Sequence, residues 1–175
     1  MRKQAIAYWL VPGEPARSFF DETIVDLARR YCAPVFEAHM TIHVGSDRVE
    51  PAREAIAEVA RLCGPVRVKA LEVRQSGEFV KTLFVQFALN RRVQRLNEII
   101  RNAGHDSFDY QIQPHVSLIY KRMSILARCQ LARSIKIPFS EVVFDSIKAV
   151  RCASPTRSSA DVEAWRVVAM KALSG

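Results

Sequence analysis

Short apolar runs, typical of strands, alternate along this chain with segments in which apolar residues recur every three or four positions, as in helices. Residues 4–11 form a short apolar run that ends at Pro12-Gly13, which is typical of a buried strand followed by a turn. Between residues 14 and 30, apolar residues recur at steps of three and four, which predicts an amphipathic helix. The stretch 39–44 then predicts a second strand.

The alternation of helices and strands continues to the end of the chain. Residues 50–63 carry one apolar stripe and are followed by Gly64-Pro65, which indicates a helix that ends there. Two strands are expected next, at 66–73 and 79–87. The second half predicts, in order, a helix at 91–104, a strand at 115–120, a helix at 125–135, a strand at 141–152, an exposed turn-rich loop at 153–161 and a strand at 163–173.

The order helix, strand, helix, strand, strand therefore occurs twice after the first strand. A duplicated unit of this kind predicts an α+β fold with two lobes, related by pseudo-two-fold symmetry, on either side of a cleft. No linker separates the two copies, so we expect residues 1–175 to form a single bilobal domain.

One short motif opens the central strand of each copy. Its two occurrences are His39-Met40-Thr41-Ile42 and His115-Val116-Ser117-Leu118. The two histidines are 115 − 39 = 76 residues apart, close to the repeat length. Because side chains alternate along a strand, each histidine shares a face with its hydroxyl residue, and that face is expected to line the cleft. One such motif is common on structural strands, but two at equivalent places predict a functional pair.

Two imidazoles that meet across a cleft suit the hydrolysis of a phosphodiester. One, as the neutral base, takes a proton from water, and the other, protonated, gives one to the leaving oxygen. The hydroxyls of Thr41 and Ser117 can donate hydrogen bonds to the non-bridging phosphate oxygens. This chemistry requires no metal, cofactor or nucleophilic serine. The sequence does not decide which histidine is the acid, because the motifs are locally equivalent.

Four other residues each allow two interpretations. Lys81 lies within the apolar stretch 79–87 and either contacts a substrate phosphate or takes the outward position of an edge strand. Tyr120 reaches the phosphate if its strand breaks there, although strict alternation places it on the apolar face. Trp9 either stacks on a base or packs in the core. His43 either extends the polar wall or is a solvated residue at the strand end.

The composition is that of a soluble globular protein, with 49% hydrophobic and 25% charged residues. No apolar run approaches the ~20 residues that a membrane-spanning helix needs. We therefore expect a cytoplasmic monomer without a membrane partner. The four cysteines, at positions 32, 63, 129 and 152, lack the spacing of a zinc site and are expected to be free thiols in or near the core.

The net charge of +8, from 26 basic and 18 acidic residues, favours anionic partners such as nucleotides, phosphate esters or RNA ends. The basic residues are scattered along the chain, and no tract of five or more occurs. This distribution argues against an unstructured tail that binds nucleic acid.

Two histidine–x–Ser/Thr–apolar motifs in a duplicated unit resemble the 2H phosphoesterase superfamily. Within it the chain is most similar to the cyclic phosphodiesterases of tRNA-splicing by-product metabolism, on the strength of "YWLVP", "PHVSLIY" and "FDSIKAVRCASP" with "VEAWRVVAMKAL". The resemblance covers nearly the whole chain. It implies a bilobal, LigT-like fold, in which two antiparallel sheets face a central cleft and helices lie outside.

The resemblance also implies an activity and a set of site residues. The activity is a metal-independent opening of ADP-ribose 1″,2″-cyclic phosphate, and of nucleoside 2′,3′-cyclic phosphates to 2′-phosphates. The catalytic residues are then His39, Thr41, His115 and Ser117, with Tyr120 as a contact to phosphate or water.

Two alternatives to this activity stay open. The first is an RNA 2′,3′-cyclic phosphodiesterase or 2′-5′ RNA ligase-like enzyme that acts on RNA ends, favoured if the basic surface collects into a groove beside the cleft. The second is a non-catalytic nucleotide or RNA binder that has kept the pocket.

Overall fold

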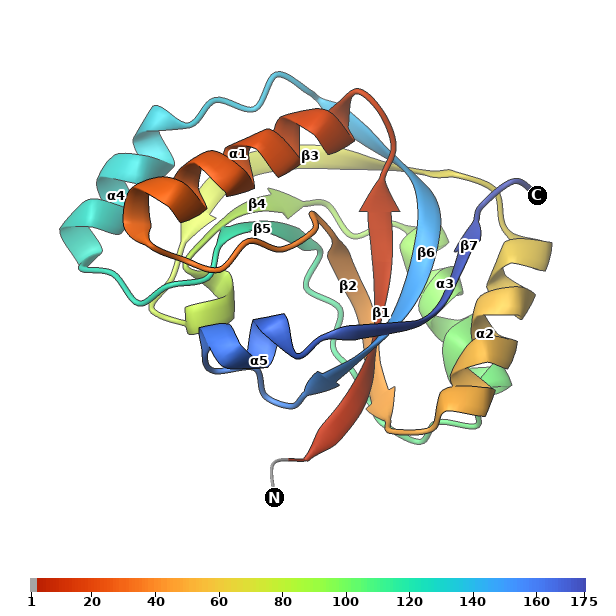
Figure 1. Ribbon diagram of the computed structural model, residues 1–175. Coiled ribbons are helices and arrows are strands. Elements are labelled where there is room, and N and C mark those ends of the chain that lie inside the picture. Colours follow the sequence, from red (N-terminus) through yellow and green to blue (C-terminus); the bar gives the residue numbers. More distant parts are fainter. Residues whose placement is uncertain (1–2) are drawn as a thin grey trace.

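The computed structural model describes residues 3–175 and has strands and helices in nearly the predicted order (Figure 1). The elements, in chain order, are β1 Gln4–Pro12, α1 Ala16–Tyr31, β2 Met40–Ser46, α2 Val49–Leu62, β3 Val66–Gln75, the 3₁₀ turn η1 Phe79–Lys81, β4 Leu83–Phe87, α3 Arg91–Ala103, β5 His115–Ile119, α4 Ile125–Ser134, β6 Glu141–Ala153, α5 Ser159–Glu163 and β7 Arg166–Ala172. None of these helices is long and apolar enough to cross a membrane.

The strands are joined in the order β2-β1-β6-β3-β4-β5, and β7 pairs with β6. Every pairing is antiparallel. Residues 66–69 of β3 pair with β6, whereas residues from 70 onward pair with β4, so two antiparallel sheets share this strand. The helices α2 and α3 lie against the first sheet, and α1 and α4 against the second (Figure 1). The α+β fold expected from the sequence is confirmed.

The strand order is symmetric about its centre, and this symmetry shows where each copy of the repeat begins and ends. If β1, β2 and β3 are matched with β4, β5 and β6, the path β2-β1-β6 repeats as β5-β4-β3 in reverse. Each copy is therefore strand, helix, strand, helix, strand, and β7 is the additional strand. The predicted succession of helices and strands is right, but the observed repeat begins one element earlier than predicted, at β1 instead of α1. Hydrophobic periodicity does not mark this boundary, because it reports only local structure.

A β-bulge interrupts each motif strand at the same place. In the pairing of β1 with β2, Tyr8 lies opposite His43 and Trp9 opposite Thr41, so that Ile42 is the extra residue. The pairing of β4 with β5 skips Leu118 in the same way. An extra residue reverses the alternation of side chains beyond it.

The bulges explain two differences from strict alternation. His43 does not share the face of His39 and Thr41 and is not solvated, because the bulge turns it into the core, where it is fully buried. In the second copy the equivalent residue is the buried Ile119, and the following Tyr120 turns toward the cleft.

Two further segments differ from the prediction. The stretch 79–87 is not one strand, since Phe79–Lys81 form a 3₁₀ turn and β4 begins only at Leu83. The loop at 153–161 contains the start of α5, whose N-terminus is closed by a capping box between Ser158 and Asp161. A five-residue helix is too short to produce a periodic signal.

Candidate active site

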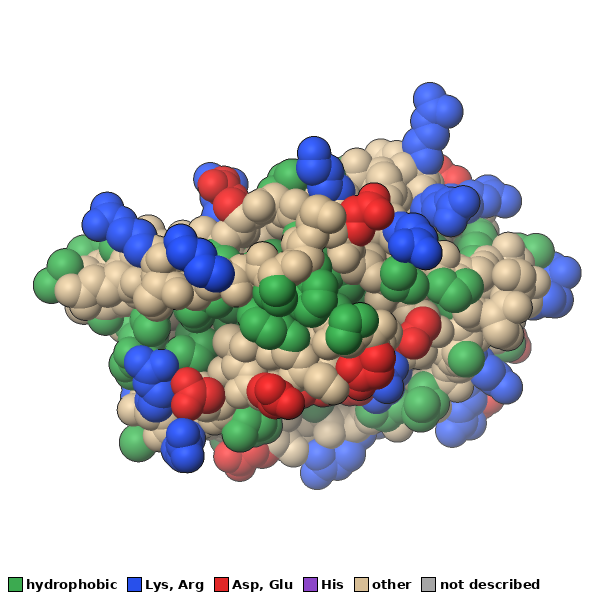
Figure 2. Space-filling view, turned by 90° about the horizontal axis from the view of Figure 1, so that it is seen from above, with side chains coloured by type: hydrophobic (Ala, Val, Ile, Leu, Met, Phe, Trp, Pro, Cys, Tyr) green, Lys and Arg blue, Asp and Glu red, His purple; other side chains and the backbone are tan. Residues whose placement is uncertain are grey.

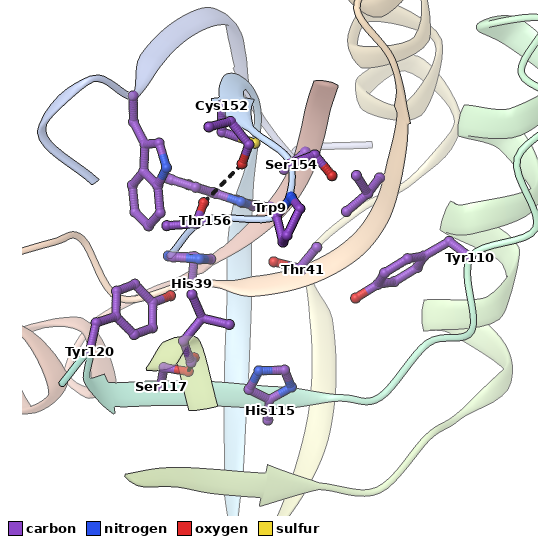
Figure 3. Close-up of a pocket in the computed structure, with 16 residues that line it drawn as sticks. Trp9, His39, Thr41, Tyr110, His115, Ser117, Tyr120, Cys152, Ser154 and Thr156 are labelled. Atoms are coloured by element: carbon purple, nitrogen blue, oxygen red, sulfur yellow. Dashed lines mark hydrogen bonds between the residues drawn. The ribbon is translucent and has the colours of Figure 1, made fainter. Parts of the chain in front are cut away.

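A cavity of about 330 Å³ lies between the two motif strands (Figure 3). Its lining includes all four motif residues: His39, Thr41, His115 and Ser117. His39 comes directly before β2, and the other three lie on β2 and β5. The structure thus places the two motifs, 76 residues apart in the chain, around one space (115 − 39 = 76).

The two histidine rings are held in the same way. His39 Nδ1 lies 2.7 Å from the carbonyl oxygen of Glu37, and His115 Nδ1 lies 2.6 Å from that of Gln113. A carbonyl oxygen can only accept a hydrogen bond, so Nδ1 carries the proton in both rings. The Nε2 atom of each neutral imidazole is therefore left free to take a proton.

The surroundings of the two rings differ. His39 is 6% exposed, and its ring stacks on Trp9 with the centroids 3.7 Å apart. Burial lowers the pKa of His39 to about 4, with smaller contributions from His115 and Lys148. His115 is less enclosed, and burial lowers its pKa too, opposed by the hydrogen bond to Gln113. The neutral form is thus more strongly favoured for His39.

The two hydroxyl residues also differ. Ser117 Oγ donates to the carbonyl oxygen of Val80 at 2.8 Å. Thr41 Oγ1 has no hydrogen-bond partner among residues 3–175. Thr41 is therefore ready to donate to a bound anion, whereas Ser117 must first rotate away from Val80.

Tyr120 lines the cavity, and in Figure 3 its hydroxyl group points toward His39. Its ring stacks on Phe36, with the centroids 3.9 Å apart and the planes 9° apart. Burial raises the pKa of Tyr120, so its hydroxyl stays protonated and can serve as a donor. Contact of Tyr120 with a substrate stays a prediction.

The other two residues predicted to bind substrate have different positions. Trp9 is buried and its ring packs on His39, but it also lines the cavity, and its stacking on a base stays a prediction. Lys81 is not among the lining residues. Its Nζ donates to Gln113 Oε1 at 2.7 Å and lies 4.8 Å from the centroid of the Phe84 ring. The prediction that Lys81 lies within a strand is wrong, and its contact with phosphate stays untested.

Sequence reasoning missed a second wall of the cavity, which two loops supply. Tyr110 comes from the α3–β5 loop, while Ser154, Thr156 and Trp165 come from the segment between β6 and β7 (Figure 3 labels the first three). The Nε1 atom of Trp165 is buried and has no hydrogen-bond partner within the described residues. Tyr110, Ser154 and Thr156 lie in loops, which carry no periodic pattern. Trp165 falls within the strand predicted at 163–173, but β7 begins only at Arg166, so Trp165 belongs to the turn before it.

His43 belongs to a buried network behind the cavity. Asn97 Nδ2 donates to the carbonyl of Ile42 at 2.8 Å and lies 3.3 Å from His43 Nδ1, which must be the acceptor. His43 Nε2 then donates to Asp106 Oδ2 at 3.2 Å. The same oxygen accepts from the backbone N–H of Ser46 at 3.1 Å. This network ties β2 to the loop that carries Tyr110.

Gly45 allows Asp106 to approach β2. A Cβ atom at this position would overlap the Asp106 carboxylate. The residue type at 45 thus follows from a close approach and requires no unusual backbone angle.

The cysteines are free thiols, as expected, but they do not all lie in the core. Cys32 is exposed, and Cys152 is buried against the cavity. Burial raises the pKa of Cys152 to about 11, so its thiol is protonated at neutral pH. No three His, Cys, Asp or Glu side chains of residues 3–175 form a group that could hold a metal ion.

Known structures share this fold. Crystal structures of E. coli LigT in its apo form (10% identity, TM-score 0.60) and with 3′-AMP (12%, 0.58) match over 100% of both chains. TT0787 of Thermus thermophilus (18%, 0.58) matches over 98% of both. No family model and no curated protein sequence matches the chain. At these identities the likeness establishes the fold, and the expectation of a LigT-like fold is confirmed.

Proposed function

We propose that the chain is a metal-independent cyclic phosphodiesterase of the 2H phosphoesterase type. The observation that carries the proposal is the pair of imidazoles, each with its Nδ1 bound to a carbonyl and its Nε2 free, around one cavity that two hydroxyl residues also line. This arrangement supplies an acid, a base and neutral donors for the phosphate.

The different surroundings of the histidines suggest a role for each. Enclosure of His39 against Trp9 favours its neutral form, which suits a base. His115 is less enclosed, so burial opposes its protonated form less strongly than that of His39, and the more readily protonated of the two rings suits an acid. Water attacks phosphorus as its proton passes to His39 Nε2. The bond from phosphorus to the leaving oxygen breaks as His115 Nε2 protonates that oxygen, and a phosphomonoester remains.

The proposed substrates are nucleoside 2′,3′-cyclic phosphates and ADP-ribose 1″,2″-cyclic phosphate. A cavity of about 330 Å³ with mostly aromatic and aliphatic walls has the size and character of a small-molecule site. LigT has been crystallised with phosphate, ATP, 3′-AMP and NADP⁺, which supports nucleotide-sized ligands for this fold.

The basic residues give no support to longer RNA on the face in Figure 2. Lys and Arg side chains are scattered over that face and are interleaved with Asp and Glu. A continuous basic groove would be expected for an enzyme that tracks an RNA backbone. We favour small cyclic phosphates because the cavity has the volume of a small-molecule site.

The experiment that tests this function is phosphorus NMR of the purified protein with a nucleoside 2′,3′-cyclic phosphate in EDTA. We expect conversion to the 2′-phosphate, and no conversion by a His39→Ala/His115→Ala double variant. Activity that disappears in EDTA and returns with a divalent ion would contradict the metal-independent mechanism. Failure to convert any cyclic phosphate, ADP-ribose 1″,2″-cyclic phosphate included, would contradict the function.

The pH dependence of kcat/KM is expected to be bell-shaped, with its maximum on the acid side of neutrality. The base is active when deprotonated, and the lowered pKa of about 4 keeps His39 neutral down to acid pH. The acid is active when protonated, and the lowered pKa of His115 brings its loss of the proton below the usual 6.5. Initial rates from pH 4 to 9, with circular dichroism as a check of folding, measure this. A maximum above pH 8 would contradict the assignment.

A further inference from the structure

Each catalytic histidine has a lysine behind it. The side chain of Glu37, whose carbonyl oxygen orients His39, accepts from Lys148 Nζ through both carboxylate oxygens, each at 2.7 Å. In the other copy Gln113 orients His115 through its carbonyl, and its Oε1 accepts from Lys81 at 2.7 Å. Both histidines are thus oriented by a residue whose side chain a lysine holds.

The pseudo-two-fold symmetry does not account for this likeness. Glu37 and Gln113 are equivalent, since each stands two residues before its histidine. Lys148, however, lies on β6, whose counterpart is β3, whereas Lys81 lies in η1, just before β4. Two lysines from unrelated positions thus bind the residue two before each histidine, one through a carboxylate and one through an amide oxygen, which points to a function for these contacts.

We propose that Lys148 and Lys81 are positioning residues, each of which holds one catalytic histidine in place through the residue whose carbonyl orients it, Glu37 or Gln113. Neither lysine lines the cavity, so neither is proposed to contact substrate. The inference rests on the proposed function, because it assigns these lysines to the acid and base of that reaction.

The groups that face the two rings are few. Around His39 they are Glu37, Lys148 and His115, together with Tyr120 and Cys152, which are neutral because burial raises the pKa of both. Around His115 they are Lys81 and Glu78, with His39 across the cavity. Lys148 opposes protonation of His39, and Lys81 opposes protonation of His115. Each lysine therefore acts mainly on one histidine.

The two ends of the Lys148–Glu37 ion pair allow a sharp test. Lys148→Met removes the cation, so the pKa of His39 is expected to rise by roughly 0.5–1 unit, less than a charge in direct contact would cause. Glu37→Gln breaks the same ion pair but leaves the cation, so the pKa of His39 should fall or stay. NMR titration of the histidine ring protons measures both. If both variants shift the pKa of His39 upward, the contact is merely structural and the proposal is overturned.

The second lysine supplies the matched comparison. Lys81→Met should raise the pKa of His115 and leave that of His39 in place, whereas Lys148→Met should do the reverse. In kcat/KM profiles, Lys148→Met is expected to move the rising limb to higher pH and Lys81→Met the falling limb. Lys148→Arg and Lys81→Arg keep the charge, so both limbs of their kcat/KM profiles should stay at the wild-type pH. Both lysine variants moving the same limb, or neither moving one, would overturn the proposal.

The NMR titration separates this inference from the proposed function. Selective shifts of His39 and His115 in a protein that hydrolyses no cyclic phosphate would contradict the function while the lysine contacts stand. Hydrolysis with unaltered histidine titrations would overturn the positioning role alone. We also expect the lysine variants to lower kcat with little change in KM, because neither side chain reaches the cavity.

Discussion

Replacing His39 or His115 with alanine is expected to lower the rate of cyclic phosphate hydrolysis by at least about 10²-fold in each case, the usual contribution of a general acid or base. Both rings border the same cavity, and each has its Nδ1 engaged by a carbonyl, so each provides one proton-transfer atom. The effects of the two substitutions should be far from multiplicative, because acid and base act in one step.

Steady-state kinetics of the two single variants and the double variant measure this effect. His39→Gln serves beside His39→Ala, since the cavity left beneath Trp9 by alanine could itself disturb folding. His105→Asn is a matched control: His105 is exposed, and its backbone φ of 47° suits asparagine. Full activity in either alanine variant would remove the two-histidine mechanism.

Asp106→Ala is expected to destabilise the protein and to weaken catalysis together. The substitution leaves the buried Nε2–H of His43 and the backbone N–H of Ser46 without their acceptor. Each unsatisfied buried donor costs about 1–3 kcal/mol. Because Asp106 also ties the loop of Tyr110 to β2, one wall of the cavity should become mobile, with a loss in kcat/KM.

Urea denaturation and kinetics of the same protein samples measure both effects. Asp106→Asn keeps one acceptor oxygen and should lose less stability than Asp106→Ala. An unchanged denaturation midpoint in Asp106→Ala would show that the network adds nothing to stability. A lower midpoint with unchanged kinetics would show that the network does not support the cavity.

Periodicity and the two motifs were enough to predict the α+β fold, the order of most elements and the meeting of His39 with His115. They could not predict which face of the sheet the residues after Ile42 and Leu118 occupy. That face is set by the bulges, which depend on pairing with β1 and β4. For this reason both interpretations of His43 were wrong, and the sequence left the face occupied by Tyr120 open. A bulge has no fixed sequence pattern.

Other features depended on tertiary context. Lys81 looked like a strand residue because the stretch around it is apolar, yet hydrogen bonds from Ser76 and Thr82 to carbonyls of residues 78, 79 and 81 stabilise a turn there. Trp165 and Tyr110 come from loops whose path is set by the buried contacts of their neighbours. The contacts of Lys148 with Glu37 join residues 111 positions apart, beyond the reach of any local pattern.

The two bulges also separate the motif positions that are alike in both copies from the position after each bulge, which differs between them. Beyond each bulge, one residue returns to the cavity: Val44 in the first copy and Tyr120 in the second. These two positions are related by the pseudo-two-fold axis but differ in size and polarity, while the histidine and hydroxyl positions before the bulge keep their chemistry. Val44 and Tyr120 therefore add to the differences between the surroundings of His39 and His115, and they are places where substrate preference can diverge without a change in the acid or the base.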